Sequence, residues 1–168
     1  IKALNKGKSI YVEKPLALTE ESLIEIEEAI YNSENPKLFV GFNRRFAAAT
    51  QFVKQKLNAK AANSITFRFS VPPLDKDHWT NMKEIGGGRI VGEAIHAIDL
   101  ACYLFDSLPQ SVASSAPINK DNNEANENQV FISVNFANGS HAAIQYFSET
   151  NQSLAKERIE IHLSLIHI

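Results

Sequence analysis

The hydrophobic pattern of this 168-residue chain changes character near residue 43, and this change constrains its fold more than any other feature. Before it, Lys8–Val12 and Leu38–Phe42 are short apolar runs typical of buried parallel strands. Between them a helical pattern begins at Thr19, a good N-cap, and ends at Asn35–Pro36. Strand, helix and strand in this order indicate the tail of a doubly wound α/β domain.

From residue 43 onward the pattern is that of an α+β domain. Ala47–Leu57 is helical, and Asn138–Gly139 between two alternating runs is a strong hairpin signal. The polar stretch Asn119–Asn128 predicts an exposed loop. We therefore expect a mainly antiparallel open sheet backed by helices, with strands at Ile65–Phe69, Ser111–Ala116, Val130–Phe136, His141–Phe147 and Arg158–Ile161.

Both ends of the chain indicate a fragment. Ile1–Lys6 is typical of the last turns of a helix, with Gly7 as its left-handed C-cap, so we expect the chain to begin within a domain. Leu163–Ile168 resembles a translated sequencing adapter, and we interpret residues 162–168 as a non-native tail. The alternative is a genuine hydrophobic strand that is cut short.

Composition excludes several classes of protein. The formal net charge of -2 gives no electrostatic reason for nucleic acid or an anionic membrane to be the main partner. No apolar run approaches the roughly 20 residues that span a bilayer. Cys102 is the only cysteine, which excludes an internal disulfide and a cysteine-based zinc cluster. We expect a soluble, cytoplasmic protein.

The segment Arg89–Phe105 is apolar almost all round, which predicts a buried helix. It nevertheless carries a stripe of polar residues, which needs partners or a wet cavity. One interpretation is an internal network in which Asp99 orients His96 or caps a neighbouring loop. The other is a substrate cleft lined by Glu93 and His96, with His96 able to transfer a proton near neutral pH. Helical spacing places the whole stripe on one face: Arg89, Glu93, His96, Asp99 and Tyr103.

The glycine run Gly86–Gly88 before this helix is a weak signal. It is not a dinucleotide fingerprint, because G-x-G-x-x-G is absent and no strand leads into it, and no Gly-Lys-Ser/Thr follows. Three glycines indicate a close backbone approach, a flexible start of the helix or tight helix packing.

Glu13–Lys14–Pro15 follows directly on a predicted parallel strand, at the edge where α/β sheets bind their ligands. A lysine there is either a surface charge or a donor held over a site. Pro15 restricts Lys14 to an extended backbone, which favours a positioned lysine.

Two further groups remain open to more than one interpretation. Arg44 and Arg45 follow Asn43 at the domain junction, where they could bind phosphate or carboxylate; we favour pairing with acidic neighbours. The His78–Trp79 pair could supply an aromatic platform for a sugar ring, or Trp79 could be ordinary packing.

Four motifs, in this order, resemble the Gfo/Idh/MocA family of NAD(P)-dependent oxidoreductases. They are Y-V-E-K-P-L-A-L-T, V-G-F-N-R-R-F, D-H-W and G-G-G-R-I-V-G-E-A-I-H-A-I-D-L. Together they extend over most of the chain, and the last two are similar to members found with bacterial polysaccharide and nucleotide-sugar genes. The resemblance implies that residues 1–42 end a Rossmann domain and that residues 43–161 form a substrate-binding and oligomerisation domain.

The resemblance also implies roles for individual residues. Lys14 would lie by the nicotinamide and the substrate hydroxyl, and His96 would accept the proton. It further implies that Glu13, Pro15 and Arg44 bind the cofactor with Lys14, and that the substrate is bound by Asn43, His78, Trp79, Arg89 and Glu93. Many members have an aspartate four residues before the histidine, where this chain has Gly92 and then Glu93. On an α-helix that shift turns a side chain by about 100°.

We therefore expect the intact protein to be an NAD- or NADP-dependent dehydrogenase of a sugar, cyclitol or nucleotide-sugar, assembled as a homo-oligomer through the C-terminal sheet. The fragment alone is expected to be inactive, because it lacks the nucleotide-binding half. The alternatives are a non-catalytic sugar- or cofactor-binding relative acting as a sensor or scaffold, and an oligomerisation domain with no retained site.

Overall fold

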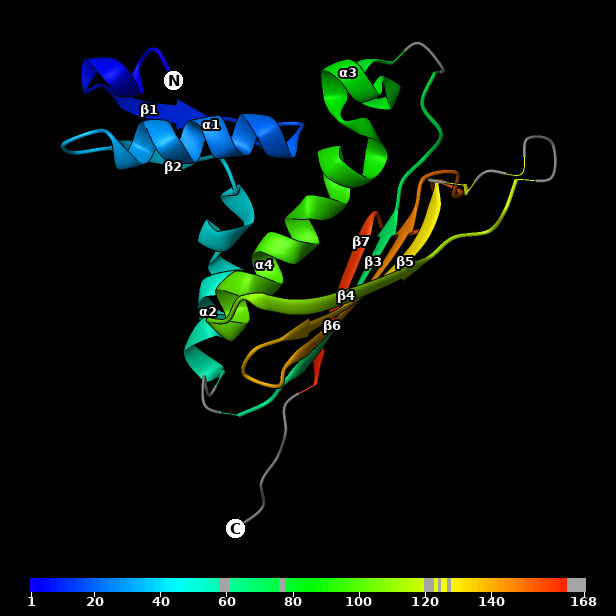
Figure 1. The fold of residues 1–168 in the computed structure, drawn as a ribbon. Helices are drawn as coiled ribbons and strands as arrows, with labels where there is room; N and C mark the ends of the chain where they lie inside the picture. The colour runs from blue at the N-terminus through cyan, green and yellow to red at the C-terminus, as the bar shows by residue number, and fades with distance from the viewer. Residues whose placement is uncertain (58–60, 76–77, 120–122, 124, 127, 163–168) are drawn as a thin grey trace.

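The computed structural model describes residues 1–57, 61–75, 78–119, 123, 125, 126 and 128–162. It contains a small β–α–β unit and a five-stranded sheet crossed by a long helix (Figure 1). The residues 163–168 of the expected non-native tail lie outside the described residues. No described helix is long and apolar enough to cross a membrane.

The first unit pairs β1, Ser9–Val12, in parallel with β2, Lys37–Val40, as predicted. The expectation that these strands are buried was wrong, because their residues alternate between exposed and half-buried, and Tyr11 is 61% exposed. The physical reason is that the described chain provides only these two strands and one helix to cover them.

The helices of this unit begin or end at the two predicted cap residues, Thr19 and Gly7. The helix α1, Glu20–Tyr31, begins after Thr19, whose Oγ1 accepts a hydrogen bond from the Ser22 backbone N–H at 3.2 Å. It ends four residues before the predicted Asn35 boundary. Gly7 adopts φ of +64° and closes a turn that is a 3₁₀ helix, η1 (Leu4–Lys6), rather than an α-helix.

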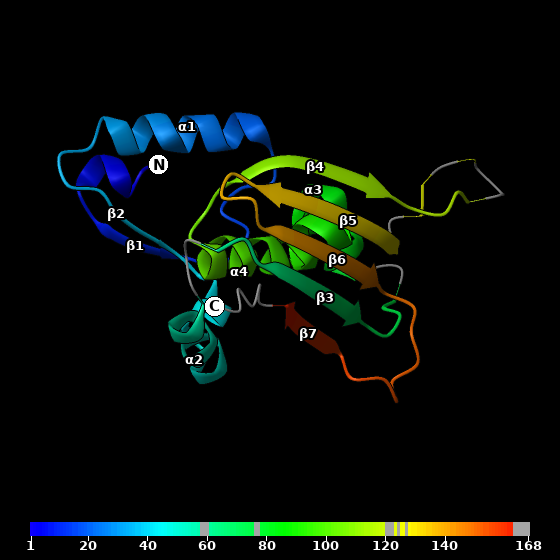
Figure 2. The same cartoon turned by 90° about the horizontal axis from the view of Figure 1, so that it is seen from below.

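The second part is a sheet with the strand order β4-β5-β6-β3-β7 (Figure 2). Only β3 and β6 run parallel to each other, and the other three pairs are antiparallel, which confirms the predicted topology. Gly139, at φ of +83°, lies in the predicted hairpin turn. The strands are β3 (Ser64–Ser70), β4 (Pro109–Ser115), β5 (Gln129–Phe136), β6 (His141–Phe147) and β7 (Glu157–His162).

The core lies between this sheet and α4, Ile95–Phe105, which crosses one face of it (Figures 1 and 2). Phe105 packs edge-to-face on Phe136 of β5 with ring centroids 5.2 Å apart, an arrangement worth about 1 kcal/mol beyond the buried area. The predicted buried helix is confirmed over the inward positions Ala97, Leu100, Ala101, Leu104 and Phe105. The remaining helices are η2 (Asn43–Phe46), α2 (Ala48–Lys56), η3 (Trp79–Asn81) and α3 (Lys83–Gly86).

The expected single α-helix from Arg89 to Phe105 is wrong in one respect. Residues Ile90–Ala94 form a π-helical turn, η4, before α4 begins. Because such a turn is wider than an α-helical turn, α-helical spacing does not describe the directions of the side chains on either side of it. Wide turns of this kind are frequent at functional sites.

Candidate active site

Lys14 links the end of β1 to the wide turn η4. Its Nζ donates a hydrogen bond to the backbone carbonyl of Gly92 at 2.5 Å. Burial lowers the pKa of Lys14, and the Glu93 carboxylate opposes this shift. The lysine is therefore a fixed, half-buried donor and not a free surface charge.

His96 lies in the first turn of α4, four residues after Gly92. Its Nδ1 is buried and has no hydrogen-bond partner within the described residues, and its ring meets the edge of Phe42, with centroids 6.3 Å apart. Burial, together with the positive charges of Arg44 and Lys14, lowers the pKa of His96 to about 4. The imidazole is therefore neutral at pH 7 and able to accept a proton.

Arg44 and Arg45 both pair with acidic residues, which is the interpretation the sequence favoured. Arg44 forms a bidentate ion pair with Glu157 of β7, in which Nη2 and Oε1 are 2.6 Å apart, and its guanidinium lies 5.4 Å from the Phe69 ring centroid. Arg45 forms a bidentate pair with Asp99. Asp99 therefore has an internal partner, Arg45 of the neighbouring η2, as the internal-network interpretation expects, although it does not orient His96 directly.

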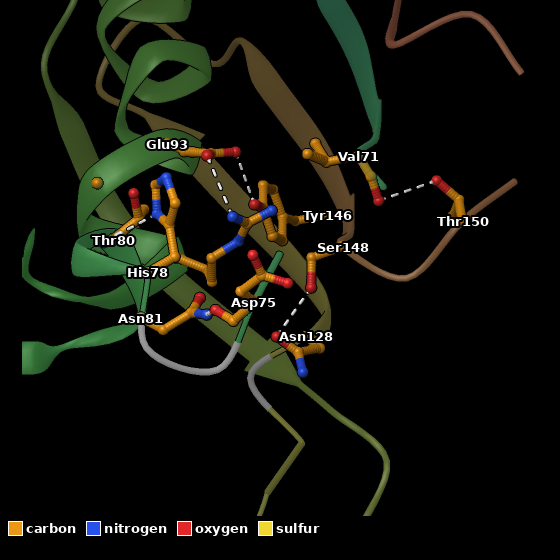
Figure 3. Close-up of polar contacts among 12 residues, drawn as sticks. Val71, Asp75, His78, Thr80, Asn81, Glu93, Asn128, Tyr146, Ser148 and Thr150 are labelled. Atoms are coloured by element: carbon orange, nitrogen blue, oxygen red, sulfur yellow. Dashed lines mark hydrogen bonds and ion pairs between the residues drawn. The ribbon is translucent and has the colours of Figure 1, made fainter. Parts of the chain in front are cut away.

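Glu93 is held by two neighbours on the sheet side of η4 (Figure 3). The hydroxyl of Tyr146 on β6 donates to Glu93 Oε2 at 2.7 Å, and Arg89 Nη1 lies 3.5 Å from Glu93 Oε1. Burial raises the pKa of Tyr146, and the hydrogen bond to Glu93 raises it further. The predicted polar stripe is thus divided, because Arg89 and Glu93 contact β6 while Asp99 contacts η2.

Gly92 has little room for a side chain. A Cβ at this position would lie 3.1 Å from the Gly86 carbonyl oxygen and 3.6 Å from Thr80 Cγ2. An aspartate here would point at the Gly86 backbone, so Glu93 is the carboxylate that this turn presents near Lys14.

The glycine run follows the first of its three interpretations, a close backbone approach. A Cβ at Gly86 would lie 2.7 Å from the Trp79 carbonyl oxygen and 2.8 Å from Thr80 Cα. Gly87 and Gly88 adopt φ of +74° and +75°, which side chains other than glycine rarely adopt. The run therefore holds η3 against the start of the long helix.

The structure brings some of the predicted site residues together and leaves others apart. Lys14 interacts electrostatically with Arg44, Glu93 and His96, so these residues share one neighbourhood around it. Glu13 is exposed beside them and accepts a hydrogen bond from the Tyr11 hydroxyl at 3.0 Å.

The other residues predicted to bind substrate or cofactor lie at the edge of this group. Trp79 is 59% exposed and stacks on His78, with ring centroids 5.8 Å apart, while the His78 Nδ1 accepts from the Thr80 N–H. Asn43 is exposed at the start of η2, and Pro15 follows Lys14 across a cis peptide bond.

Sequence reasoning missed Tyr146 and Glu157. Tyr146 occupies an inward position of an alternating strand, and a buried tyrosine needs a partner for its hydroxyl, so this signal was present. Glu157 gave no signal, because its partner Arg44 is 113 residues away in the sequence.

The chain has known relatives. Residues 61–165 match the profile of the GFO/IDH/MocA C-terminal domain. The chain is 29% identical over 165 residues to inositol 2-dehydrogenase of Rhizobium meliloti, covering 93% of this chain and 48% of that protein. It is 34% identical over 112 residues to levoglucosan dehydrogenase of Pseudarthrobacter phenanthrenivorans, covering 62% of this chain and 28% of that protein.

The fold has relatives among solved structures. It is similar to myo-inositol dehydrogenase from Lactobacillus casei in complex with NAD(H) and myo-inositol, with a TM-score of 0.78 at 23% identity, covering 96% of this chain and 47% of that one. The chain spans less than half the length of each of these three proteins. Because the matched profile covers more than half of its residues, the chain belongs to the GFO/IDH/MocA family.

Proposed function

We propose that the full-length protein containing this chain is a nicotinamide-dependent dehydrogenase that oxidises a secondary hydroxyl of a sugar or cyclitol. The observation that carries the proposal is the pairing of a fixed ammonium group with a neutral imidazole. Lys14 is hydrogen-bonded to the carbonyl of Gly92, one helical turn before His96, and burial keeps His96 deprotonated at neutral pH.

In the proposed reaction His96 accepts the proton of the substrate hydroxyl. Lys14 donates a hydrogen bond to the same oxygen and stabilises the negative charge that develops on it. Arg44 adds to the effect of burial by lowering the pKa of His96 through its positive charge, and it is itself held in place by Glu157. Glu93 contributes a carboxylate whose direction is fixed by Tyr146.

The described residues fit the nicotinamide end of the cofactor. Lys14 stands at the carboxyl end of a parallel strand, where α/β sheets bind ligands, and the buried Nδ1 of His96 has no partner within the described residues. When bound, NAD or NADP takes up the hydride from the carbinol carbon. Glu13 and Pro15 flank Lys14 on this strand end, so the same segment would hold the cofactor.

Three further statements belong to the same proposal. Residues 1–42 would end a dinucleotide-binding domain, and residues 43–161 would form the substrate domain. A sugar or cyclitol substrate is supported by the relatives, which are an inositol dehydrogenase and a levoglucosan dehydrogenase. Self-association would use the sheet face opposite α4, which no described helix covers (Figure 2).

The test is an assay of the full-length protein with NAD and with NADP against a panel of cyclitols and sugars, following reduced cofactor by absorbance. The proposal expects turnover of at least one compound. Isothermal titration calorimetry with the same compounds measures binding alone, and this distinguishes the dehydrogenase from the non-catalytic alternative. Binding of a sugar and of cofactor without any hydride transfer would contradict the dehydrogenase and support a sensor or scaffold.

A further inference from the structure

The imidazole of His96 has an aromatic neighbour. Its Nδ1 is buried and has no hydrogen-bond partner within the described residues, so no bond at this nitrogen fixes the ring. The ring of Phe42 contacts it edge-to-face, with the two centroids 6.3 Å apart and the two planes at 85°. Because such pairs have a preferred geometry, the position of Phe42 restricts the direction in which the imidazole points.

The backbone of Phe42 is fixed at the end of β2. Its φ of -76° and ψ of 71° are those of an inverse γ-turn, which the Asn43 N–H closes by donating to the Gly41 carbonyl at 2.9 Å. The Gly41 N–H donates to the Val12 carbonyl at 2.7 Å. This bond ties the turn to β1, the strand that leads to Lys14, so Phe42 is held relative to both strands.

Arg45 holds the side chain of Phe42. Its guanidinium carbon lies 5.9 Å from the Phe42 ring centroid and 5.6 Å from the Tyr103 ring centroid, so one cation contacts both rings. Asp99 fixes the guanidinium through the bidentate ion pair, in which Nε and Oδ2 are 2.8 Å apart. Since Asp99 is only 8% exposed, the pair has a defined direction.

The helix α2 locks this arrangement against α4 (Figure 1). Gln51 Nε2 donates to the backbone carbonyl of Arg45 at 2.5 Å and to the hydroxyl of Tyr103 at 2.9 Å. Lys54 Nζ donates to the backbone carbonyl of Tyr103 at 2.6 Å. The two contacts of the Arg45 guanidinium are therefore supported from three elements, η2, α2 and α4.

The charge of Arg45 is balanced by Asp99, so Arg45 is suited to act on His96 through the ring of Phe42 and not through its own field. The charged groups that shift the pKa of His96 come from other positions in the fold: Lys14, Arg44, Lys156 and Glu157.

We propose that Phe42, held by Arg45, positions the imidazole of His96. The inference rests on the proposed function for the role of His96 as proton acceptor, because proton transfer requires the accepting nitrogen to be aligned with the substrate hydroxyl. It also explains why Asp99 and Tyr103 lie on the same helix as His96: both hold Arg45. Phe42 and Arg45 are positioning residues, since they act through their contacts with the reacting group.

The first test measures the ionisation of His96 and needs no turnover. The imidazole NMR signals of the full-length protein would be titrated from pH 4.5 to 8, with His96→Asn identifying the His96 signal. Phe42→Leu removes the ring and part of the burial that lowers the pKa of His96, so we expect that pKa to rise by about 0.5 or more. Phe42→Tyr keeps the ring and should leave the pKa of His96 near its wild-type value.

A matched control shows whether the effect belongs to this ring. Phe52 lies on α2, is 62% exposed and has the Lys56 ammonium 5.5 Å from its ring centroid, so it is also an aromatic ring beside a cation. Phe52→Leu should leave the titration of His96 unchanged.

A second pair of variants tests the support given by Arg45. Arg45→Lys keeps the positive charge and loses the bidentate pair with Asp99, so any change in His96 comes from the movement of Phe42. We expect the pKa of His96 to shift upward as in Phe42→Leu. Arg158→Lys, at an arginine side chain that is 61% exposed, is the control and should not shift it.

The second test uses turnover of the full-length protein. Loss of orientation slows the chemical step without weakening substrate binding, so Phe42→Leu should lower kcat about 10-fold while KM stays within about 2-fold. Phe42→Tyr should recover most of kcat, and Phe52→Leu should keep it.

The outcomes separate this inference from the proposed function. A raised pKa of His96 in Phe42→Leu and Arg45→Lys, with no reduced cofactor from any compound, would support the positioning of His96 and contradict the dehydrogenase. Turnover with the same His96 pKa in wild type and both variants would leave the dehydrogenase standing and overturn the inference. An equal fall of kcat in Phe42→Leu and Phe52→Leu would also overturn it.

Discussion

The Lys14 ammonium group donates a hydrogen bond to the backbone carbonyl of Gly92, 78 residues later in the chain. This contact joins the end of the first parallel strand to the wide turn that leads into α4. It places a cation one helical turn before His96 and near the Glu93 carboxylate. The candidate site is therefore built where the two parts of the fold meet.

Replacing Lys14 tests whether that cation acts in the reaction. Lys14→Met keeps the length of the side chain and removes the charge, so we expect kcat to fall about 100-fold or more through loss of electrostatic stabilisation. Lys8→Met, at an exposed lysine just before β1, is the matched control and should change kcat less than about 2-fold. Equal effects of the two substitutions on kcat would show that Lys14 does not act in the reaction.

The pH dependence of activity should report on His96. A base must be deprotonated, so activity is present above its pKa and is lost as pH falls through that value. Since burial and the nearby positive charges together lower the pKa of His96 to about 4, kcat/KM should stay near its plateau through pH 6.5, the ordinary value for histidine, and decline only toward pH 4. Initial rates measured from pH 4 to 8 check this.

Arg44 provides the internal comparison for the pH profile. Arg44→Met removes a positive charge that lowers the pKa of His96, so the acidic limb should move upward toward pH 6.5. Arg158→Met, on the same strand as the Glu157 that pairs with Arg44, should leave the limb in place. A wild-type limb already at pH 6.5, or one that does not respond to Arg44→Met, would contradict this account of His96.

Tyr146 is expected to stabilise the fold through Glu93. Tyr146→Phe removes only the hydroxyl that donates to Glu93 Oε2, and loss of a hydrogen bond to a charged group should lower the free energy of unfolding by about 1–3 kcal/mol. Tyr31→Phe, at a tyrosine that is 89% exposed, should change it by less than about 0.5 kcal/mol. Urea denaturation at pH 7 compares the two, and a similar value for both would show that the Glu93 contact contributes nothing.

Local patterns predicted most of the architecture. Local sequence patterns located all five strands of the large sheet, and Thr19, Gly7 and Gly139 marked caps and a turn that the structure confirms. These features depend on neighbours within a few residues, so a single sequence contains the information for them.

Partners distant in the sequence were harder to predict. The pairing of Asp99 with Arg45 spans 54 residues, and that of Glu93 with Tyr146 spans 53. In neither pair does the sequence around one residue indicate the identity of its partner. The wide turn η4 was also missed, because the residues around Gly92 carry the same apolar spacing as an ordinary α-helix. The sequence named Glu93 as a site residue, but that turn and Tyr146 determine the direction of its carboxylate, which could be established only in the structure.

The role of His96 as proton acceptor is the central claim, and one comparison of two histidine variants tests it most directly. Turnover of the full-length protein would be measured at pH 7 for His96→Asn and for His141→Asn, at a histidine on β6 bonded to Ser133. The account predicts that His96→Asn lowers kcat about 100-fold or more and that His141→Asn stays within about 3-fold of wild type. Unchanged turnover in His96→Asn would show that another group accepts the proton and would contradict the account.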